Sequence, residues 1–337
     1  MDLNNCVTMI QTYLSDVPLV VLGSGNSASY GLPTMTDLSN EIIRHEGDFD
    51  QSDEVVKDFF DNIRRGLDLE TAIGMGFQLN SEDINLIREI IWNYINKRDL
   101  DFFERGLKTD FIEFSLVDLI KKIISPTPYK ANIITTNYDR LAEYAADIAG
   151  ASIVTGFEGS YFRKMELPSE SIKNKRIKAR ERTVAIWKVH GSLDWFLSPN
   201  GSQCDLPRSM TIPDTFIPHI VPPGNNKYYE THQDPYRSVI SQADSAIANA
   251  KSFLVVGYGF NDSHIQPKII EEIKKGTPIV VITKTFTSQC KELFSQSNIP
   301  KYILIEERDG KTHVLTKDWE ADYEDDFWSL KGFLNKW

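Results

Sequence analysis

Six short apolar runs recur along the chain, and they constrain the fold more than any other feature. The clearest, at 19–22, reads Leu-Val-Val-Leu and is followed at once by glycine. Runs of this kind, in which polar residues do not alternate with apolar ones, are typical of parallel strands that are buried on both faces of a sheet. We therefore predict strands at 19–22, 132–135, 183–189, 252–256, 278–282 and 302–305.

Segments with apolar residues at helical spacing lie between several of these runs, at 139–149, 236–250 and 265–275. Strands that alternate with helices are typical of an α/β protein in which helices cover both faces of a parallel sheet. The sequence therefore predicts a Rossmann-like, doubly wound parallel sheet.

Other regions depart from this alternation. Over 36–125 the apolar residues recur at helical spacing without a convincing strand, so we predict a helical insertion there, within a single domain that covers 1–337. The stretches 156–182 and 198–234 are rich in proline, glycine and asparagine, and we expect them to be irregular and to cover one face of the sheet. The acidic and aromatic stretch 318–328 is expected to pack its apolar side as a final helix.

The composition argues against several classes of protein. Of the 337 residues, 41% are hydrophobic and 25% are charged, and no apolar run approaches the roughly 20 residues that cross a bilayer. The first residues lack the basic and apolar regions of a secretory signal, so we expect a cytoplasmic protein without a membrane segment. A net charge of −11 argues against general binding of nucleic acid, which depends on neutralising phosphate groups.

The cysteines and one basic run permit fewer conclusions. Cys6, Cys204 and Cys290 are too few and too far apart for a disulfide framework or a four-cysteine zinc site. Six lysines and arginines gather between Lys173 and Arg182. They form either a solvated surface or a surface for a partner or an anion.

The first glycine-rich segment follows the strand predicted at 19–22. Gly23 and Gly25 permit a tight turn and a close approach of the backbone to a diphosphate, and Ser24 and Ser27 add hydroxyl groups. The usual three-glycine fingerprint is incomplete, because alanine occupies its third position. A purely structural glycine turn therefore remains an alternative.

A polar segment follows the strand predicted at 132–135. Thr136 and Asn137 come directly after this strand, at the carboxyl edge where ligands of open α/β folds bind. The Asn137 amide suits a ribose hydroxyl or a water molecule. Asp139 stands just before a helical segment, so it belongs either to the same site or to the helix as its N-cap.

His190 stands where the strand predicted at 183–189 meets Gly191. Because imidazole titrates close to neutral pH and glycine leaves room for a ligand, His190 is the strongest candidate for proton transfer. Its neighbours Trp187 and Trp195 also fit a histidine that is simply packed in the core.

A last glycine segment follows the strand predicted at 252–256. Gly257 and Gly259 leave space for a ribose or a phosphate, with Tyr258 between them. The next residues, Asn261, Asp262 and Ser263, serve either this site or the following helix as caps.

The order of these four segments resembles that of the sirtuin-like NAD-consuming family. They read Gly-Ser-Gly-Asn-Ser, Thr-Thr-Asn-Tyr-Asp, Val-His-Gly-Ser and Gly-Tyr-Gly-Phe. In particular, the chain resembles the bacterial branch found in anti-phage defence, whose members cleave NAD to nicotinamide and ADP-ribose. The resemblance implies that NAD is a substrate and that no prosthetic group is bound.

The resemblance also implies roles for individual residues. Asn137 would lie beside the nicotinamide ribose, Asp139 would shape that pocket, and His190 would be the catalytic base. The residues implied to bind the rest of NAD are Gly23, Ser24, Gly25 and Ser27 at the diphosphate, Thr136 beside the motif asparagine, and Gly257 and Tyr258 near the adenosine.

Two departures from the family pattern bear on the reaction. Sirtuins that deacylate proteins carry two cysteine pairs in a zinc ribbon after the histidine, whereas this chain has only Cys204 and Cys290 there. Where they have Pro-Asp-Phe-Arg after the glycine loop, this chain has Leu-Pro-Thr-Met-Thr-Asp at 32–37. We therefore expect no zinc and an NAD hydrolase rather than a deacylase.

Two other functions remain open: a sensor subunit that binds NAD or ADP-ribose in a defence complex, and a protein deacylase without zinc. The family resemblance further implies control by assembly, as a homo-oligomer or with a HerA-type ATPase.

Overall fold

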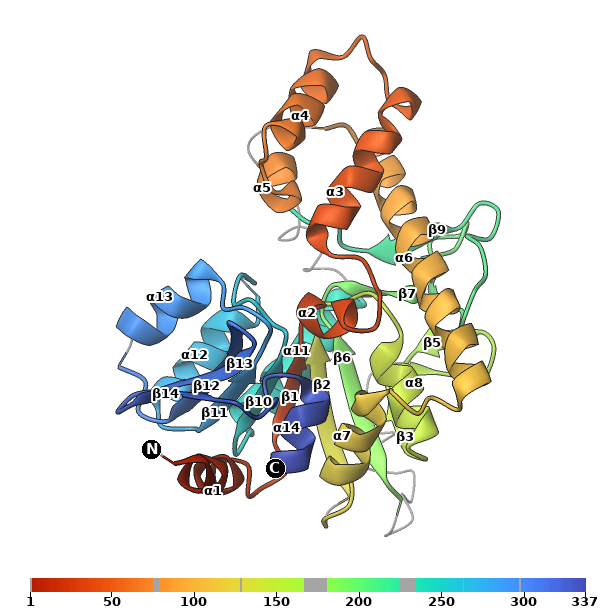
Figure 1. Ribbon diagram of the computed structural model, residues 1–337. Helices are drawn as coiled ribbons and strands as arrows, with labels where there is room; N and C mark the ends of the chain where they lie inside the picture. The colour runs from red at the N-terminus through yellow and green to blue at the C-terminus, as the bar shows by residue number, and fades with distance from the viewer. Residues whose placement is uncertain are drawn as a thin grey trace.

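A computed structural model describes residues 2–74, 79–127, 129–166, 181–224, 234–262, 264–296 and 298–337. All six predicted strands are present and lie in one nine-stranded sheet (Figure 1). They are β1 (Leu19–Leu22), β2 (Lys130–Thr135), β6 (Thr183–Lys188), β10 (Phe253–Val256), β11 (Ile279–Ile282) and β12 (Tyr302–Arg308).

The strand order is β14-β13-β12-β11-β10-β1-β2-β6-β3, and every pairing from β12 to β3 is parallel. From β1 the chain builds the sheet in one direction through β2 and β6, and it then returns to β10 on the other side of β1. The predicted doubly wound sheet is therefore confirmed, and its direction reverses at β1.

The sheet has three further strands that the sequence did not predict. The edge strand β3 (Ser152–Val154) has only three residues and pairs with β6. At the opposite edge, β13 (Lys311–Thr316) and β14 (Glu320–Tyr323) add two antiparallel strands. The expectation of a helix over 318–328 was therefore wrong. Side chains alternate between exposed and half-buried along 320–323, which is the period of a strand, and the last helix starts only at residue 330.

Successive residues of each strand point to opposite faces of the sheet, and helices cover both faces. Val20 belongs to one hydrophobic core and Val21 to the other. The core that contains Val20 includes α1 (Leu3–Tyr13), α7 (Ser115–Ile123), α8 (Leu141–Ile148) and α14 (Leu330–Lys336). The core that contains Val21 includes α11 (Tyr236–Ala248), α12 (Gln266–Lys274) and α13 (Ser288–Gln296).

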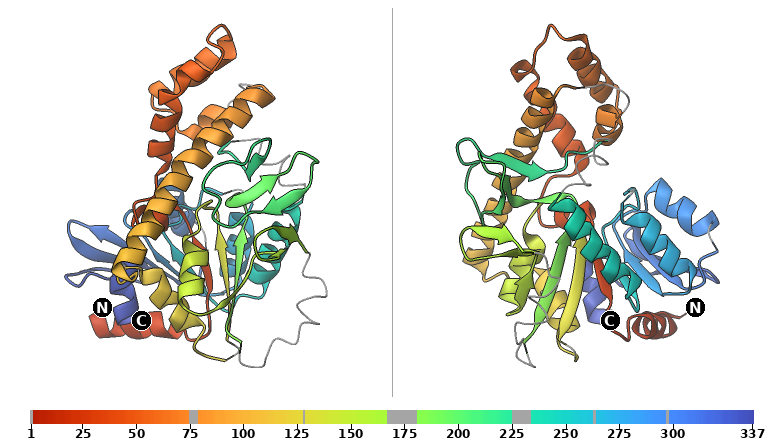
Figure 2. Two further views of the ribbon diagram at one scale, coloured as in Figure 1. Left: turned by 90° about the vertical axis from the view of Figure 1, so that its right-hand side faces the viewer. Right: turned by 180° about the vertical axis from the view of Figure 1, so that it is seen from behind.

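The helices predicted over 36–125 fall into two groups. Most of them form an arm that projects away from the sheet (Figures 1 and 2). The last one, α7, packs instead on the sheet against α8. A short α2 (Ser24–Ala28) precedes the arm. The arm is built from α3 (Met35–Arg44), a 3₁₀ turn η1 (Glu46–Asp48), α4 (Glu54–Arg64), α5 (Leu69–Gly74) and the long α6 (Ser81–Thr109).

The two stretches expected to be irregular contain short strands of a second sheet. Its order is β4-β5-β8-β7-β9, and all its pairings are antiparallel. The strands are β4 (Phe157–Glu158), β5 (Arg163–Met165), β7 (Gly191–Leu197), β8 (Gln203–Asp205) and β9 (Ile217–Ile220). Most of the basic run at 173–182 lies outside the described residues.

The arm and the small sheet share a third hydrophobic core. Helix α6 contributes Ile91 and Trp92, and the small sheet contributes Leu193 and Phe196. The Trp92 indole also donates a hydrogen bond of 2.9 Å to the Leu193 carbonyl. The arm is thus fixed to β7, the strand that follows His190.

A buried arginine joins α6 to the rest of the protein. The Arg140 guanidinium lies 2.8 Å from Asp99 of α6 and 2.5 Å from Asp194 of β7. The Arg140 side chain is 1% exposed and that of Asp99 is 0% exposed. Tyr144 of α8 donates a further hydrogen bond of 2.6 Å to Asp99.

In the part of the chain that the structure describes, no helix is long and apolar enough to span a membrane.

Candidate active site

Three loops meet at the carboxyl edge of the large sheet, where the strand order reverses. They follow β1, β2 and β10, which are neighbours in the sheet with β1 in the middle. Open α/β folds bind ligands at such a switch point. A cavity of about 350 Å³ opens there, and it is lined by nine of the ten residues to which the resemblance gives a role: Ser24, Gly25, Ser27, Thr136, Asn137, Asp139, His190, Gly257 and Tyr258. His190 reaches it from the loop after β6, and Gly23 is not part of the lining.

Glycine is required where the loops after β1 and β10 pack backbone against backbone. The amide of Gly25 donates to the Gly257 carbonyl at 2.9 Å, and the amide of Gly23 donates to Val256 at 3.0 Å. A Cβ atom on Gly23 would lie 2.4 Å from the Gly257 oxygen. These glycines therefore hold the two loops together, and the Gly25 amide is already paired within the protein.

Gly257→Ala is expected to destabilise the protein by about 2–4 kcal/mol. Gly257 has a φ of +61°, and an added Cβ would lie 2.1 Å from the Asn26 nitrogen. Urea denaturation would measure the loss. The control is Gly310→Ala, because Gly310 has a φ of +77° but nothing within 4 Å of its Cβ position, so it should lose only about 1–2 kcal/mol. Equal losses of stability in Gly257→Ala and Gly310→Ala would contradict a role of Gly257 in packing the two loops.

Asn137, Ser27 and Asp139 form a chain of hydrogen bonds along one wall of the cavity. The Asn137 amide nitrogen donates to the Ser27 hydroxyl at 2.8 Å and to the Gly23 carbonyl at 2.9 Å. The Ser27 hydroxyl donates to Asp139 Oδ2 at 2.6 Å. The other carboxylate oxygen of Asp139 accepts from the Leu141 amide at 3.1 Å. Asp139 thus lines the cavity and also binds the first amide of α8, whose N-cap residue is Arg140.

Lys188 lies behind Asp139, away from the cavity. Its side chain is 1% exposed, and its ammonium group contacts the Asp139 carbonyl oxygen and lies 2.8 Å from Glu143 Oε1. Burial raises the pKa of Asp139 to about 6, although the charge of Lys188 and the Ser27 hydroxyl both oppose this increase. The Asp139 carboxyl group therefore titrates within the physiological range.

His190 lies on the same cavity and pairs with a carboxylate. Its Nε2 atom is 2.8 Å from Asp262 Oδ2, and both residues are buried. The second oxygen of Asp262 accepts from the amides of His264 and Ile265 at 2.9 and 3.0 Å. Burial would raise the pKa of Asp262, but the His190 imidazole and these amides outweigh it and hold the pKa below its usual range. Asp262 therefore remains ionised beside the histidine.

In the sequence, Asp262 had two alternative roles, in the site or as a cap of the following helix. It contacts His190, and its other oxygen accepts from the amides of the turn before α12, whose N-cap residue is Ile265. The only sequence signal was its place a few residues after the carboxyl end of a buried strand. Ser263, the third of the expected capping residues, lies outside the described residues.

Other cavity residues had no distinct signal in the sequence. Met35 and Leu38 of α3 and Ile95 of α6 reach the cavity from the arm. From beyond β11, Thr283, Thr285 and Thr287 line the cavity on the side of β10. Among the described residues, no group of three or more histidine, cysteine or acidic side chains is placed to hold a metal ion.

The fold and this constellation define an α/β protein with a polar site at the switch point of its parallel sheet. Comparison with known families identifies the class: a model described as a SIR2-like domain matches residues 131–323, which is more than half of the chain. The protein belongs to the SIR2-like family.

Solved structures give matches at low sequence identity. A crystal structure of a Sir2 homologue in complex with NAD is 14% identical, with 88% of this chain and 87% of that chain covered and a TM-score of 0.47. A structure of Sir2 from a study of the mechanism and regulation of Sir2 enzymes is 16% identical, with coverages of 85% and 87% and a TM-score of 0.42. Sir2Tm bound to a propionylated peptide is 12% identical, with coverages of 84% and 88% and a TM-score of 0.41. No curated protein matches the chain.

Proposed function

We propose that the protein is an NAD glycohydrolase, which cleaves NAD to nicotinamide and ADP-ribose. The observation that carries this proposal is that Asn137 and the His190–Asp262 pair line one cavity at the switch point of a SIR2-like fold. The cavity volume of about 350 Å³ is within the range of small-molecule sites.

The geometry suits the cleavage of a glycosidic bond that already has a good leaving group. The bond between the anomeric carbon and the nicotinamide nitrogen breaks, and its electron pair neutralises the positive charge of the nicotinamide ring. The oxygen of a water molecule forms the new bond to the anomeric carbon, and the proton of that water passes to His190 and then to solvent. The ionised Asp262 stabilises the imidazolium that forms.

Asn137 orients the ribose in this proposal. Both of its amide N–H bonds are used inside the protein, to Ser27 and to Gly23, so the side chain has one orientation. Its amide oxygen is then held in a fixed position to accept a hydrogen bond from a ribose hydroxyl. Positioning of this kind lowers the barrier because the reacting groups are aligned before the reaction begins.

The test is to incubate the purified protein with NAD and to follow nicotinamide and ADP-ribose by chromatography. Release of both products, absent in His190→Ala, would support the hydrolase. Binding of NAD without products would indicate the sensor instead. Nicotinamide release only when an acylated peptide is added would indicate the deacylase.

The biological role belongs to the same proposal. We propose depletion of NAD in anti-phage defence by a cytoplasmic protein, with control by homo-oligomerisation or by a HerA-type ATPase; this rests on the resemblance of the motifs. Size-exclusion chromatography with mass measurement, with and without the candidate ATPase, would test the assembly. A monomer under both conditions would contradict it.

Asp139→Asn is expected to remove a pH dependence of stability. The pKa of Asp139 is about 6 in the folded protein against an ordinary value of 3.8. The folded state therefore binds this proton more tightly than the unfolded state does. The resulting stability is fully present below about pH 4 and is lost as pH rises through 6, a change on the order of 3 kcal/mol.

Urea denaturation of the wild type and of Asp139→Asn between pH 4 and 8 would measure this effect as the difference between the two proteins. Asp147→Asn is the control, because Asp147 is an exposed residue of the same helix, α8. A difference between wild type and Asp139→Asn that stays constant with pH would contradict a raised pKa at Asp139.

A further inference from the structure

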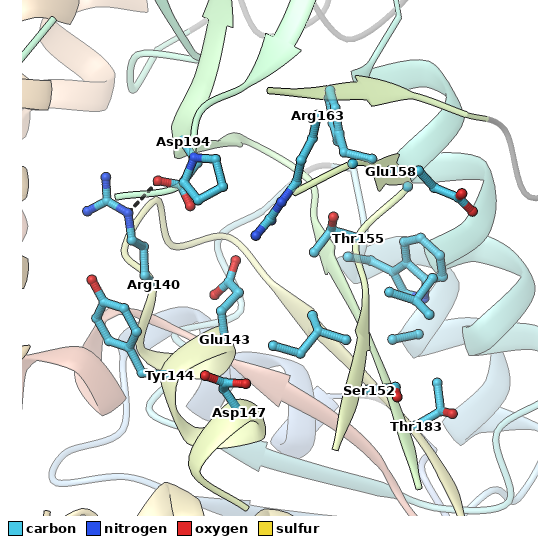
Figure 3. A pocket seen from close by; sticks show the side chains of 18 of the residues that line it. Arg140, Glu143, Tyr144, Asp147, Ser152, Thr155, Glu158, Arg163, Thr183 and Asp194 are labelled. Carbon is cyan, nitrogen blue, oxygen red and sulfur yellow. Dashed lines mark hydrogen bonds and ion pairs between the residues drawn. The ribbon is translucent and has the colours of Figure 1, made fainter. Parts of the chain in front are cut away.

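A second and larger cavity lies away from the candidate active site. Its volume is about 1070 Å³, and it shares no lining residue with the first cavity. It is bounded by the edge strand β3 with its neighbour β6, by α8, and by loops and strands of the small sheet (Figure 3). Nothing in the proposed reaction uses it.

The lining of this cavity carries more acidic than basic groups, with six acidic residues against four lysines and arginines. The arginines already have partners. Arg140 is paired with Asp99 and Asp194, Arg163 lies 3.5 Å from Asp205, and Arg208 lies over the Phe103 ring at 4.0 Å.

Within the part of the chain that the structure describes, Glu143 has one carboxylate oxygen with a partner and one without. Its side chain extends from α8 toward the centre of the cavity (Figure 3). Oε1 receives the Lys188 ammonium group at 2.8 Å, Oε2 has no hydrogen-bond partner among the described residues, and the side chain as a whole is 15% exposed. A ligand with an N–H group would give this carboxylate the second donor that the described residues do not supply.

We propose that this cavity binds a small organic cation, whose ammonium group pairs with the Glu143 carboxylate. The remaining walls suit the aliphatic part of such a molecule, since Ile153, Val154, Ala185 and Trp187 line the cavity together with hydroxyl groups. The volume is large enough for a linear amine of several carbons, and groups of metal-binding side chains are absent from the described residues. The ligand class is therefore an aliphatic amine or polyamine.

Lys188 connects this cavity to the candidate active site. It contacts Glu143 on one side and Asp139 on the other, and Asp139 holds Ser27 and through it Asn137. An ammonium group at Glu143 adds positive charge near Lys188 and Asp139. Occupancy of the cavity is thus expected to change turnover; this consequence, unlike the binding itself, rests on the proposed NAD hydrolysis.

Spermidine is the probe, and isothermal titration calorimetry with the full chain measures its binding. Glu143→Gln keeps the volume and removes the charge, and it is expected to weaken spermidine binding at least tenfold. Glu271→Gln is the control, because Glu271 is an exposed residue of α12 with an i,i+4 contact to Lys275. Ala185→Leu fills the cavity without changing Glu143 and is also expected to weaken binding.

The affinities of the variants distinguish a specific site from adsorption to an acidic surface. Equal affinity in wild type, Glu143→Gln and Ala185→Leu would mean adsorption to an acidic surface and would overturn the site. Binding of inorganic phosphate in place of spermidine would overturn its proposed preference for cations. A cooperative thermal transition in each variant shows that it is folded.

The coupling is tested by NAD turnover with and without saturating spermidine. A change in kcat of at least twofold in the wild type, absent in Glu143→Gln, is expected. Unchanged turnover with intact binding would overturn the coupling alone. If the wild type does not cleave NAD at all, the proposed hydrolase fails, and the calorimetric comparison still decides whether the cavity is a site.

Discussion

His190→Ala is expected to lower kcat for NAD cleavage by about 10²–10⁴-fold, the range that a positioned general base contributes. The variant loses the group that accepts the proton from water, and water already in the cavity is a much weaker base. The substitution also leaves the buried Asp262 carboxylate without its partner, so a loss of stability is expected beside the loss of activity. Initial rates of nicotinamide release would measure the loss, and a cooperative thermal transition would show that the protein is folded.

A matched control is offered by a second buried histidine. His313 lies 2.7 Å from Asp322 in the antiparallel edge of the large sheet and does not line the candidate active site. His313→Ala should leave kcat unchanged, even if it lowers stability. Equal rates in folded His190→Ala and wild type would refute the proposed role of His190.

Asp262 extends the same test, because it acts through His190. Removing its carboxylate should lower kcat more than it changes KM and should add little in a protein that already lacks His190. Asn137→Ala is expected to reduce turnover by a separate route, the loss of ribose orientation. If Asp262→Asn lowered kcat in the His190→Ala protein by the same factor as in the wild type, the proposed pairing of the two residues would be contradicted.

Arg140→Met is expected to destabilise the protein by about 3–5 kcal/mol, the usual cost of removing one partner of a buried ion pair. The variant would leave Asp99 and Asp194 buried without their counter-ion. Burial by itself would lower the pKa of Arg140, but these two carboxylates raise it, so the arginine is charged in the folded protein.

Chemical denaturation would measure this loss. Arg98→Met on the same helix as Asp99 is the control, because Arg98 is exposed and lies over the Tyr94 ring at 5.3 Å. It should lose no more than about 1 kcal/mol. If Arg140→Met were as stable as Arg98→Met, the ion pairs would not be what fixes α6 to the sheet.

The sequence predicted the central sheet most clearly at β1, β10 and β11, because these strands are buried on both faces and are therefore continuously apolar. The residues 253–256 and 279–282 are buried throughout. Edge strands do not have this property. The three residues of β3 are all half-buried, and β14 alternates between exposed and half-buried side chains, so neither forms an apolar run. In the small sheet, β4, β5, β8 and β9 have only two to four residues each, too few to show the alternation of a strand.

The candidate site was predictable to the extent that it follows from strand ends. Residues just after β1, β2 and β10 must meet at one edge of a parallel sheet, and they do. The partners of these residues are set by tertiary packing. The sequence places Asp262 more than seventy residues from His190, and Lys188 is one polar residue within an otherwise apolar strand. Neither contact has a local pattern that could reveal it.

The third hydrophobic core joins segments that lie far apart in the chain. It is assembled from α3 to α6 on one side and from β7, β8 and β9 on the other, segments separated by roughly a hundred residues of chain. Deleting the arm would expose Leu193, Phe196 and Ile220 to water and would remove the surface on which the strand after His190 is built. The arm and the small sheet are therefore expected to unfold together, and a version of this protein reduced to its parallel sheet would lack the support that places its histidine.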